Sequence, residues 1–221
     1  MLATFTDRSG GVSHGVFASL NLGDHVNDLP ADVQANREIL QSKYGAVQFM
    51  NQVHGSRIAI IESVTEEAPT ADALVTGISG ITLAVMVADC IPLLLTSPES
   101  VAAVHVGRRG LVNGVAVKTI ELMREMGASQ IRADIGPAIC GRCYEVSPEV
   151  QEEVLELHPL AIAQTPTGTP ALDLPKALKA TLKAAGISVI NESGICTVES
   201  PDHFSYRRDG VTGRQVGLVS L

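Results

Sequence analysis

The chain has 221 residues and a formal net charge of −8 at pH 7; 45% of its residues are apolar and 18% are charged. This length and balance predict one globular domain, residues 1–221, with a substantial buried core. The acidic character argues against a protein that binds nucleic acid or an anionic membrane through its overall field. Neither a membrane-spanning helix nor a secretory leader is predicted from the pattern of apolar residues, so we expect a cytoplasmic protein.

Hydrophobic periodicity and boundary residues predict a set of helices along the chain. The first, Leu29–Tyr44, has Pro30 in its first turn and Gly45 directly behind it, where glycine provides a left-handed cap. Further helices are expected at Asn113–Met126, Pro148–Leu157 and Leu174–Ala185.

Strands are expected in the intervals, and several are apolar almost throughout, as is typical of strands that are covered on both faces. The candidates are Arg57–Glu62, Ala73–Thr76, Ile81–Val87, Leu93–Thr96, Val101–Val104, Ile131–Ile135, Ser188–Asn191 and Gln215–Ser220. Together with the helices they predict an α/β domain with a central sheet flanked by helices. Residues Gln164–Pro170 are expected to form a flexible surface loop.

Three metal-capable side chains, His54, Cys90 and His105, each lie at or just past the C-terminal end of an apolar, strand-like run. Such placement lets remote parts of the chain deliver three ligands to one edge of a sheet. Two imidazoles and one thiolate suit zinc, and three protein ligands leave a fourth position open for water or substrate. The separations match no compact ligand motif, so each residue alone also fits a buried thiol or a hydrogen-bonded histidine.

The other cysteines are Cys140, Cys143 and Cys196, and the first two form a CxxC motif. This motif is typical of half a zinc ribbon or of a redox pair. The second half of a ribbon is missing, and the motif lies in a loop bounded by glycine and proline, which disfavours the redox interpretation.

Basic residues are grouped in two places despite the negative net charge. Arg108 and Arg109 form one pair, while Arg207, Arg208 and Arg214 lie near the C-terminus. Solvated surface charge is the ordinary interpretation of such arginines. Their position beside glycine-rich turns also fits a small pocket for an anion such as phosphate.

Six segments occur in a fixed order between about Thr6 and Gln215. They are RSGGVSHGVFASLNLGDHV near the start, NQVHG at 51–55, DCIPLLL at 89–95, AVHVGRRGL at 103–111, GPAICGRCYEV at 136–146 and FSYRRDGVTGRQ at 204–215. This set resembles the laccase-domain proteins, a family once called multicopper polyphenol oxidoreductases and now viewed as purine nucleoside phosphorylases with adenosine deaminase activity. Six motifs in the right order make the resemblance far more specific than any one of them.

The resemblance implies a single α/β domain of layered, mixed β-sheets flanked by helices, similar to the catalytic domain of a deamidating bacterial toxin. It implies phosphorolysis of adenosine, inosine and methylthioadenosine to a base and ribose 1-phosphate, together with deamination of adenosine. The expected partners are a nucleoside and phosphate, and we expect a monomer or weak homodimer.

The family's zinc ligands correspond to His54, Cys90 and His105, the three residues that ligand chemistry also indicates. Zinc is therefore favoured over copper as the cofactor. Asp89 precedes the cysteine and is a candidate for orienting a histidine, for acid–base chemistry or for structural support of the site.

Candidate substrate contacts lie in the same motifs. Arg8, Arg207 and Arg208 are candidates for contacting phosphate or ribose, because phosphorolysis needs positive charge around the attacking anion. Asn21 and Gln52 are candidates for hydrogen bonds that position the substrate.

Two motifs depart from the family pattern, and in the first of them Val106 replaces an alanine. Arg108 replaces the tryptophan of the AVHAGWRG motif, which removes an aromatic surface or substitutes a guanidinium plane for it. Cys140 stands where a glycine is usual. Substrate preference is therefore left open.

Two other functions remain as alternatives. A polyphenol oxidase of the multicopper type needs about ten copper ligands and HxH pairs, whereas this chain has six histidines and no HxH. The second alternative is a metal-free cysteine hydrolase with a role in peptidoglycan editing. In this enzyme Cys90 would be the nucleophile, and His54 or His105 would be the base.

Overall fold

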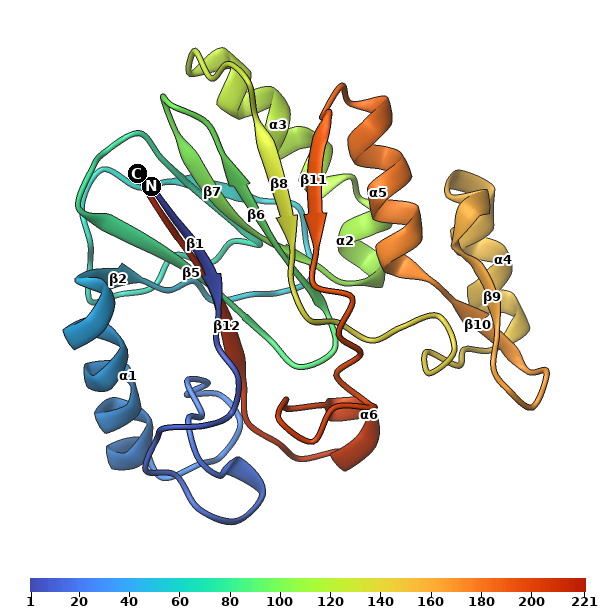
Figure 1. Ribbon diagram of the computed structural model, residues 1–221, viewed down its shortest axis with the longest axis horizontal. Coiled ribbons are helices and arrows are strands. Elements are labelled where there is room, and N and C mark those ends of the chain that lie inside the picture. Colours follow the sequence, from blue (N-terminus) through green and yellow to red (C-terminus); the bar gives the residue numbers. More distant parts are fainter.

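The computed structural model describes residues 1–221 as two stacked β-sheets with helices on both outer faces (Figure 1). The smaller sheet has the strand order β1-β12-β5-β2, with bounds Leu2–Phe5, Gln215–Ser220, Ile81–Val87 and Ala46–Gln48. The larger sheet has the order β11-β8-β6-β7-β4-β3, with bounds Val189–Glu192, Arg132–Ile135, Ile91–Thr96, Val101–Val106, Ala73–Thr76 and Ile58–Ile60. A separate hairpin consists of β9 (Ile162–Gln164) and β10 (Pro170–Leu172).

Both the smaller and the larger sheet contain parallel and antiparallel strand pairs. Strand β2 pairs with β5, β3 with β4 and β11 with β8 in parallel, while the remaining pairs are antiparallel. The two ends of the chain lie side by side, because β1 and β12 pair with Leu2 opposite Ser220.

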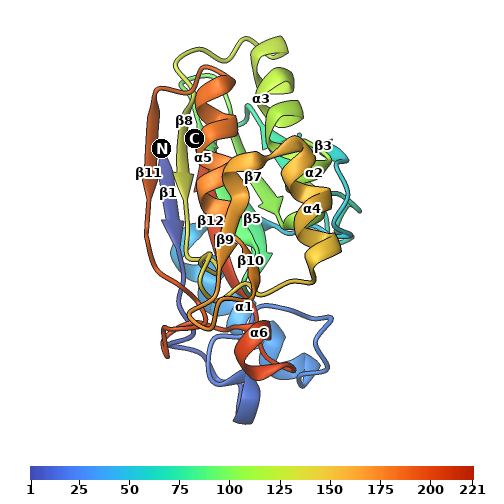
Figure 2. The same ribbon diagram turned by 90° about the vertical axis from the view of Figure 1, so that its right-hand side faces the viewer.

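The helices cover the outer faces of the sheets. Their bounds are Pro30–Tyr44 (α1), Arg108–Val112 (α2), Val115–Glu125 (α3), Pro148–Leu157 (α4), Leu174–Ala184 (α5) and Tyr206–Asp209 (α6), with 3₁₀ turns at Gly15–Phe17 and Pro159–Ala161. Helix α1 covers the smaller sheet, whereas α2 to α5 pack on the larger one. Figure 2 shows α1 and α6 at one end of the molecule and α3 at the other. No helix combines the length and the apolar character needed to cross a bilayer.

Strand β5 shows why several strands are apolar on both faces. Leu83 and Val85 point into the layer between the two sheets, where they meet Leu94 of β6. Ala84 and Met86, on the other face, pack in the cluster beneath α1. Because side chains alternate between the faces of a strand, a strand covered on both sides carries no polar alternation.

The predicted helices are confirmed with small changes at their ends, since α1, α4 and α5 agree to within one residue. The helix expected at Asn113–Met126 begins only at Val115, because Gly114 takes a left-handed conformation with φ 71°. The short helices α2 and α6 have too few turns to show a hydrophobic period and were not predicted.

The layered mixed sheets implied by the family resemblance are confirmed. The single central sheet inferred from the strand pattern alone is wrong, because β5 and β6 follow each other directly yet belong to different sheets. The expectation of a flexible loop at Gln164–Pro170 is also wrong at its ends, where Gln164 pairs with Pro170 in the β9–β10 hairpin.

Candidate active site

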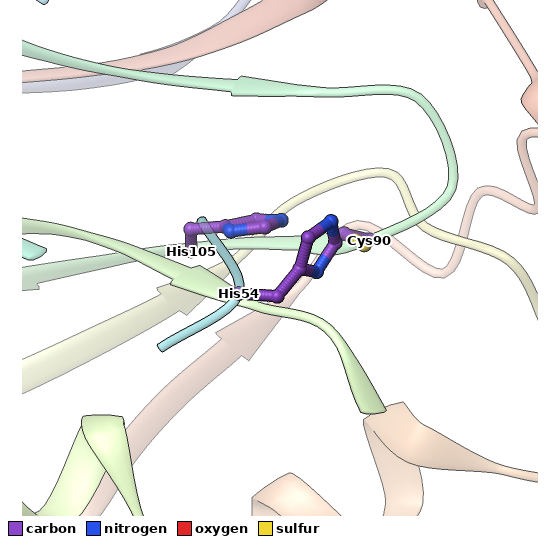
Figure 3. Close-up of side chains that lie close together, drawn as sticks. All are labelled: His54, Cys90 and His105. Carbon is purple, nitrogen blue, oxygen red and sulfur yellow. The ribbon is translucent and has the colours of Figure 1, made fainter. Parts of the chain in front are cut away.

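The structure brings together His54, Cys90 and His105, the three residues that the sequence singled out as metal ligands. Each offers one ligand atom, and these atoms all lie within 4.8 Å of one another. The two imidazole rings meet edge to face with 4.7 Å between their centroids, and Figure 3 shows the Cys90 sulfur beside them. Tetrahedral zinc holds its ligand atoms roughly 3.3–3.8 Å from each other, so side-chain movements of about 1 Å or less bring these three atoms to that spacing.

The three side chains lie in or next to connections that lead from the smaller sheet to the larger one, and they meet at one end of the larger sheet. His54 follows β2 and Cys90 lies in the turn between β5 and β6, whereas His105 is the penultimate residue of β7. Strands β2 and β5 belong to the smaller sheet and β7 to the larger one. His54 also comes before β3, and Cys90 directly before β6. The registers place the start of β3, the start of β6 and the end of β7 at the same end of the larger sheet, as the expectation of one shared sheet edge requires.

Two residues here have a backbone conformation that side chains other than glycine rarely adopt, namely His54 with φ 57° and Asp89 with φ 90°. Such a residue costs about 1–3 kcal/mol and persists only when its surroundings hold it. The His54 amide donates to Asp72 at 2.9 Å, and the Asp89 carbonyl accepts from the Ile139 amide at 2.9 Å. These bonds hold the two strained residues at the site.

A fully buried carboxylate, Asp72, connects the two histidines. Its Oδ1 lies 2.9 Å from His105 Nδ1 and accepts the His54 amide, while its Oδ2 accepts the Gly55 amide at 2.7 Å. An ionised carboxylate only accepts hydrogen bonds, so His105 carries a proton on Nδ1 and presents Nε2 to the other ligands. Such a carboxylate–histidine pair is typical of metal-binding histidines.

Asp72 is a functional residue that the sequence did not single out. Its only signal was a charged residue directly before the apolar run Ala73–Thr76. The role of orienting a histidine, which was one candidate role for Asp89, belongs to Asp72 instead.

The two histidines differ in proton affinity. Burial by itself lowers the pKa of His105, but the neighbouring Cys90 and Asp72 outweigh this effect and raise the pKa to about 9. Burial, together with the positive charge of His105, lowers the pKa of His54 below its ordinary value. In the metal-free protein at neutral pH, His105 is therefore protonated and His54 is neutral.

Gly107 keeps space open beside the ligands. A Cβ atom at this position would lie 2.9 Å from Cys90 Sγ and 3.1 Å from His54 Nδ1. Any larger residue would displace a ligand atom, so the glycine preserves room in which an ion fits. The donor set, the Asp72 support and this space all fit a bound zinc ion.

The ligands border a cavity of about 620 Å³, which falls within the range of small-molecule sites. Its wall includes three arginines and two tyrosines: Arg108, Arg207, Arg214, Tyr144 and Tyr206. The basic groups noted in the sequence therefore contribute side chains to one cavity. The tyrosines were not singled out, although Tyr144 follows the CxxC motif and Tyr206 precedes Arg207.

The arginines are held in place by partners inside the protein. The Arg207 guanidinium lies 5.2 Å from the centroid of the Tyr144 ring, and Arg108 Nη1 lies 3.2 Å from a Glu153 carboxylate oxygen. Arg214 donates from Nη1 to two nearby backbone carbonyls. Since a guanidinium has five N–H donors, each arginine retains donors for an anion.

Gln52, Asp89 and Arg207 of the predicted set line the cavity. The Gln52 amide is engaged with the backbone of Met86, to which it donates and from which it accepts at 2.8 Å. The Asp89 carboxylate accepts from the Thr197 hydroxyl at 2.7 Å and from the Arg207 amide at 2.6 Å. Asp89 thus holds the Arg207 segment against the site.

The structure places Arg8, Asn21 and Arg208 outside the cavity wall. Arg8 donates to the Ala18 carbonyl and lies over the Phe204 ring. The buried Asn21 side chain bonds within its own loop and accepts the Arg214 amide, and Arg208 donates to carbonyls of the segment before it. These three hold segments next to the site, and their role as substrate contacts stays a prediction.

Comparisons with known proteins show the family to which the chain belongs. A family model described as "Multi-copper polyphenol oxidoreductase laccase" matches residues 2–221. A protein of Streptomyces coelicolor named purine nucleoside phosphorylase is 47% identical, with 98% of this chain and 94% of that protein covered. One of the same name from Corynebacterium glutamicum is 42% identical, with 98% and 93% covered.

Two solved structures share the fold. A Neisseria meningitidis protein of the DUF152 family has a TM-score of 0.91 at 37% identity, covering 99% of this chain and 93% of that one. YlmD from Geobacillus stearothermophilus has a TM-score of 0.89 at 34% identity, covering 99% and 91%.

The Asp72→Asn substitution is expected to weaken zinc binding about 10–100-fold, because the His105 ring loses its carboxylate partner. Competition with a chromophoric chelator measures the affinity, and thermal unfolding checks that the variant is folded. Asp134→Asn is the matched control, since Asp134 accepts from Asn191 on the larger sheet and does not line the cavity. Equal affinities for both variants would contradict the role of Asp72.

Zinc affinity is also expected to rise with pH. Below the His105 pKa of about 9, zinc must displace a proton from this ring, so the affinity rises about tenfold or more per pH unit from pH 7 towards 9. Calorimetry in two buffers of different ionisation enthalpy counts the released protons. A flat profile over this interval would show that His105 is already neutral without the metal.

Proposed function

Because the chain belongs to the multi-copper polyphenol oxidoreductase laccase family, in which relatives at 42–47% identity are named purine nucleoside phosphorylase, we propose that it is a zinc-dependent purine nucleoside phosphorylase. Its substrates are adenosine, inosine and methylthioadenosine, and it also deaminates adenosine. One observation supports this proposal above all: the cluster of His54, Cys90 and His105 borders a cavity lined by three arginines.

His54, Cys90 and His105 are the residues that hold the ion in this proposal. When bound, zinc supplies a Lewis acid that can activate water for the deamination. The chain's own contribution is orientation, since Asp72 fixes both the His105 ring and the backbone of His54. Copper stays the alternative ion, but two nitrogens and one sulfur with an open position suit zinc.

Phosphorolysis places different demands on the cavity. A phosphate oxygen attacks C1′ of the ribose, the bond from C1′ to the purine nitrogen breaks, and the base leaves with the electron pair and gains a proton. Arg108, Arg207 and Arg214 surround the cavity with positive charge that can hold the attacking anion. Holding phosphate and nucleoside together supplies much of the rate enhancement.

The Tyr144 hydroxyl is available as a donor to the departing base. Burial, the largest influence, raises the pKa of Tyr144 above its ordinary value. The hydroxyl therefore stays protonated at neutral pH, and its ring lies in the cavity wall beneath Arg207. A half-buried aromatic ring also offers a planar surface for a purine.

One feature favours a second candidate, the metal-free cysteine hydrolase. Asp72 and His105 form a hydrogen-bonded pair, and Cys90 lies close enough to raise the pKa of the imidazole. A thiol, a base and a carboxylate that orients the base are the parts of a cysteine nucleophile site. Under this alternative, activity survives zinc removal and is lost when Cys90 is alkylated.

The proposal predicts that the purified protein converts adenosine and phosphate to adenine and ribose 1-phosphate, with inosine as the deamination product. Chromatography of the reaction mixture measures the products. Chelation of zinc is expected to lower turnover at least about 100-fold, and His105→Ala is expected to do the same while the protein stays folded. Full activity in either case would contradict zinc dependence.

The arginines give a second prediction with a matched control. Arg108→Gln is expected to raise the KM for phosphate about 5–10-fold, because a guanidinium in the cavity wall is removed. Arg109→Gln removes the same charge from the adjacent residue, which is exposed and outside the cavity wall, so its KM is expected to change less than about twofold. Equal effects would mean that only the overall charge of this region matters.

A further inference from the structure

A second group of soft ligands lies outside the candidate active site. The sulfur atoms of Cys140, Cys143 and Cys196 are all within 4.8 Å of one another, and all three residues are free thiols. The sequence showed a CxxC motif without a partner. The fold supplies that partner, because Cys196 comes from the segment between β11 and α6.

The backbone holds these three thiols together. In the CxxC turn the Cys143 amide donates to the Cys140 carbonyl at 3.1 Å. Ala138 and Cys196 form a parallel bridge, and the Thr197 amide donates to the Ala138 carbonyl at 3.2 Å. The convergence of the three sulfurs therefore follows from main-chain pairing between two remote segments.

Further contacts at this cluster suit a bound cation. The Cys140 amide donates to Cys196 Sγ at 3.4 Å, a bond that stabilises a negatively charged sulfur. Glu199 Oε1 lies 3.8 Å from Cys143 Sγ, and the same oxygen accepts a hydrogen bond from the Arg142 guanidinium at 2.9 Å. Cys196 is buried, whereas Cys140 and Cys143 are half-buried and open to an entering ion.

We propose that Cys140, Cys143 and Cys196 bind a second zinc ion, and that the Glu199 side chain, whose Oε1 lies beside Cys143 Sγ, turns towards the ion as its fourth ligand. Thiolates select zinc among the common biological cations, and four protein ligands close the coordination sphere, as in structural rather than catalytic sites. A disulfide does not account for the cluster equally well, because pairing any two of the sulfurs leaves the third thiol without a partner. The proposal does not depend on the enzymatic activity proposed above.

The position of the second ion explains what it does. The CxxC segment carries Ile139 and Tyr144, and the segment after Cys196 carries Tyr206 and Arg207; all four line the active-site cavity. An ion held by both segments ties two parts of the cavity wall together. The second site is therefore structural, and it stabilises the wall that faces the substrate.

Metal analysis of the reduced protein, purified without added metal, tests the proposal. About two zinc ions per chain are expected for the unaltered protein, and about one for Cys90→Ser and for Cys143→Ser alike. The variant that combines both substitutions is expected to hold none. Cys90→Ser removes only the first site. The zinc content of this variant therefore reports on the second site alone, whether or not the protein has the proposed enzymatic activity.

Cobalt provides a second readout in the Cys90→Ser background. Cobalt bound there is expected to show the sulfur-to-metal charge-transfer absorption of several thiolates, and Cys143→Ser or Cys140→Ser in this background is expected to abolish the band. Chelation is expected to lower the Tm of Cys90→Ser but not that of the combined variant. Two results would overturn the proposal. One is Cys90→Ser protein that holds no metal and shows no such absorption band, and the other is a disulfide among the three cysteines in the protein as purified.

Discussion

The candidate active site depends on one buried interaction, the hydrogen bonding of the Asp72 carboxylate. Asp72 lies directly before β4 of the larger sheet, and it accepts hydrogen bonds from His105 of β7 and from the backbone around His54. The His54 segment follows β2 of the smaller sheet. One carboxylate therefore aligns two ligands that are far apart in the chain, and leaving it without partners in the interior would cost several kcal/mol.

The two-sheet arrangement explains why a reactive site occurs at this place. The chain crosses between the sheets at Asp89 and Cys90, where a close turn demands an unusual backbone conformation and brings a thiol to the cavity. Asp89 in turn holds Thr197 and the amide of Arg207, so a basic segment from the end of the chain closes the wall. Backbone strain concentrated at a site, and held by surrounding hydrogen bonds, is a common feature of functional centres.

Local patterns predicted much of the fold. Helix α1 was visible from Pro30 and Gly45, and strands β4, β5 and β12 from apolar runs that are buried on both faces. Periodicity could not show that β5 and β6 belong to different sheets, because both strands are covered on both sides and look alike. The stacking of the sheets depends on contacts between residues far apart in the chain.

The residues of the candidate site were likewise predictable only where local sequence carries the information. His54, Cys90 and His105 were predicted because their chemistry is distinctive and their motifs resemble a known family. Asp72 and Cys196 were not assigned, because a carboxylate or a thiol becomes informative only through the partners that the fold brings to it. Arg8 and Arg208 have the right chemistry for phosphate, yet the fold directs their donors to backbone carbonyls.

The central claim is that His54, Cys90 and His105 bind one zinc ion at the wall of the cavity. A crystal of protein prepared without added metal, measured on both sides of the zinc absorption edge, tests it most directly. We predict an anomalous difference peak about 2.0–2.3 Å from His105 Nε2, from a His54 ring nitrogen and from Cys90 Sγ. The absence of a peak between these atoms in well-ordered protein would contradict the account.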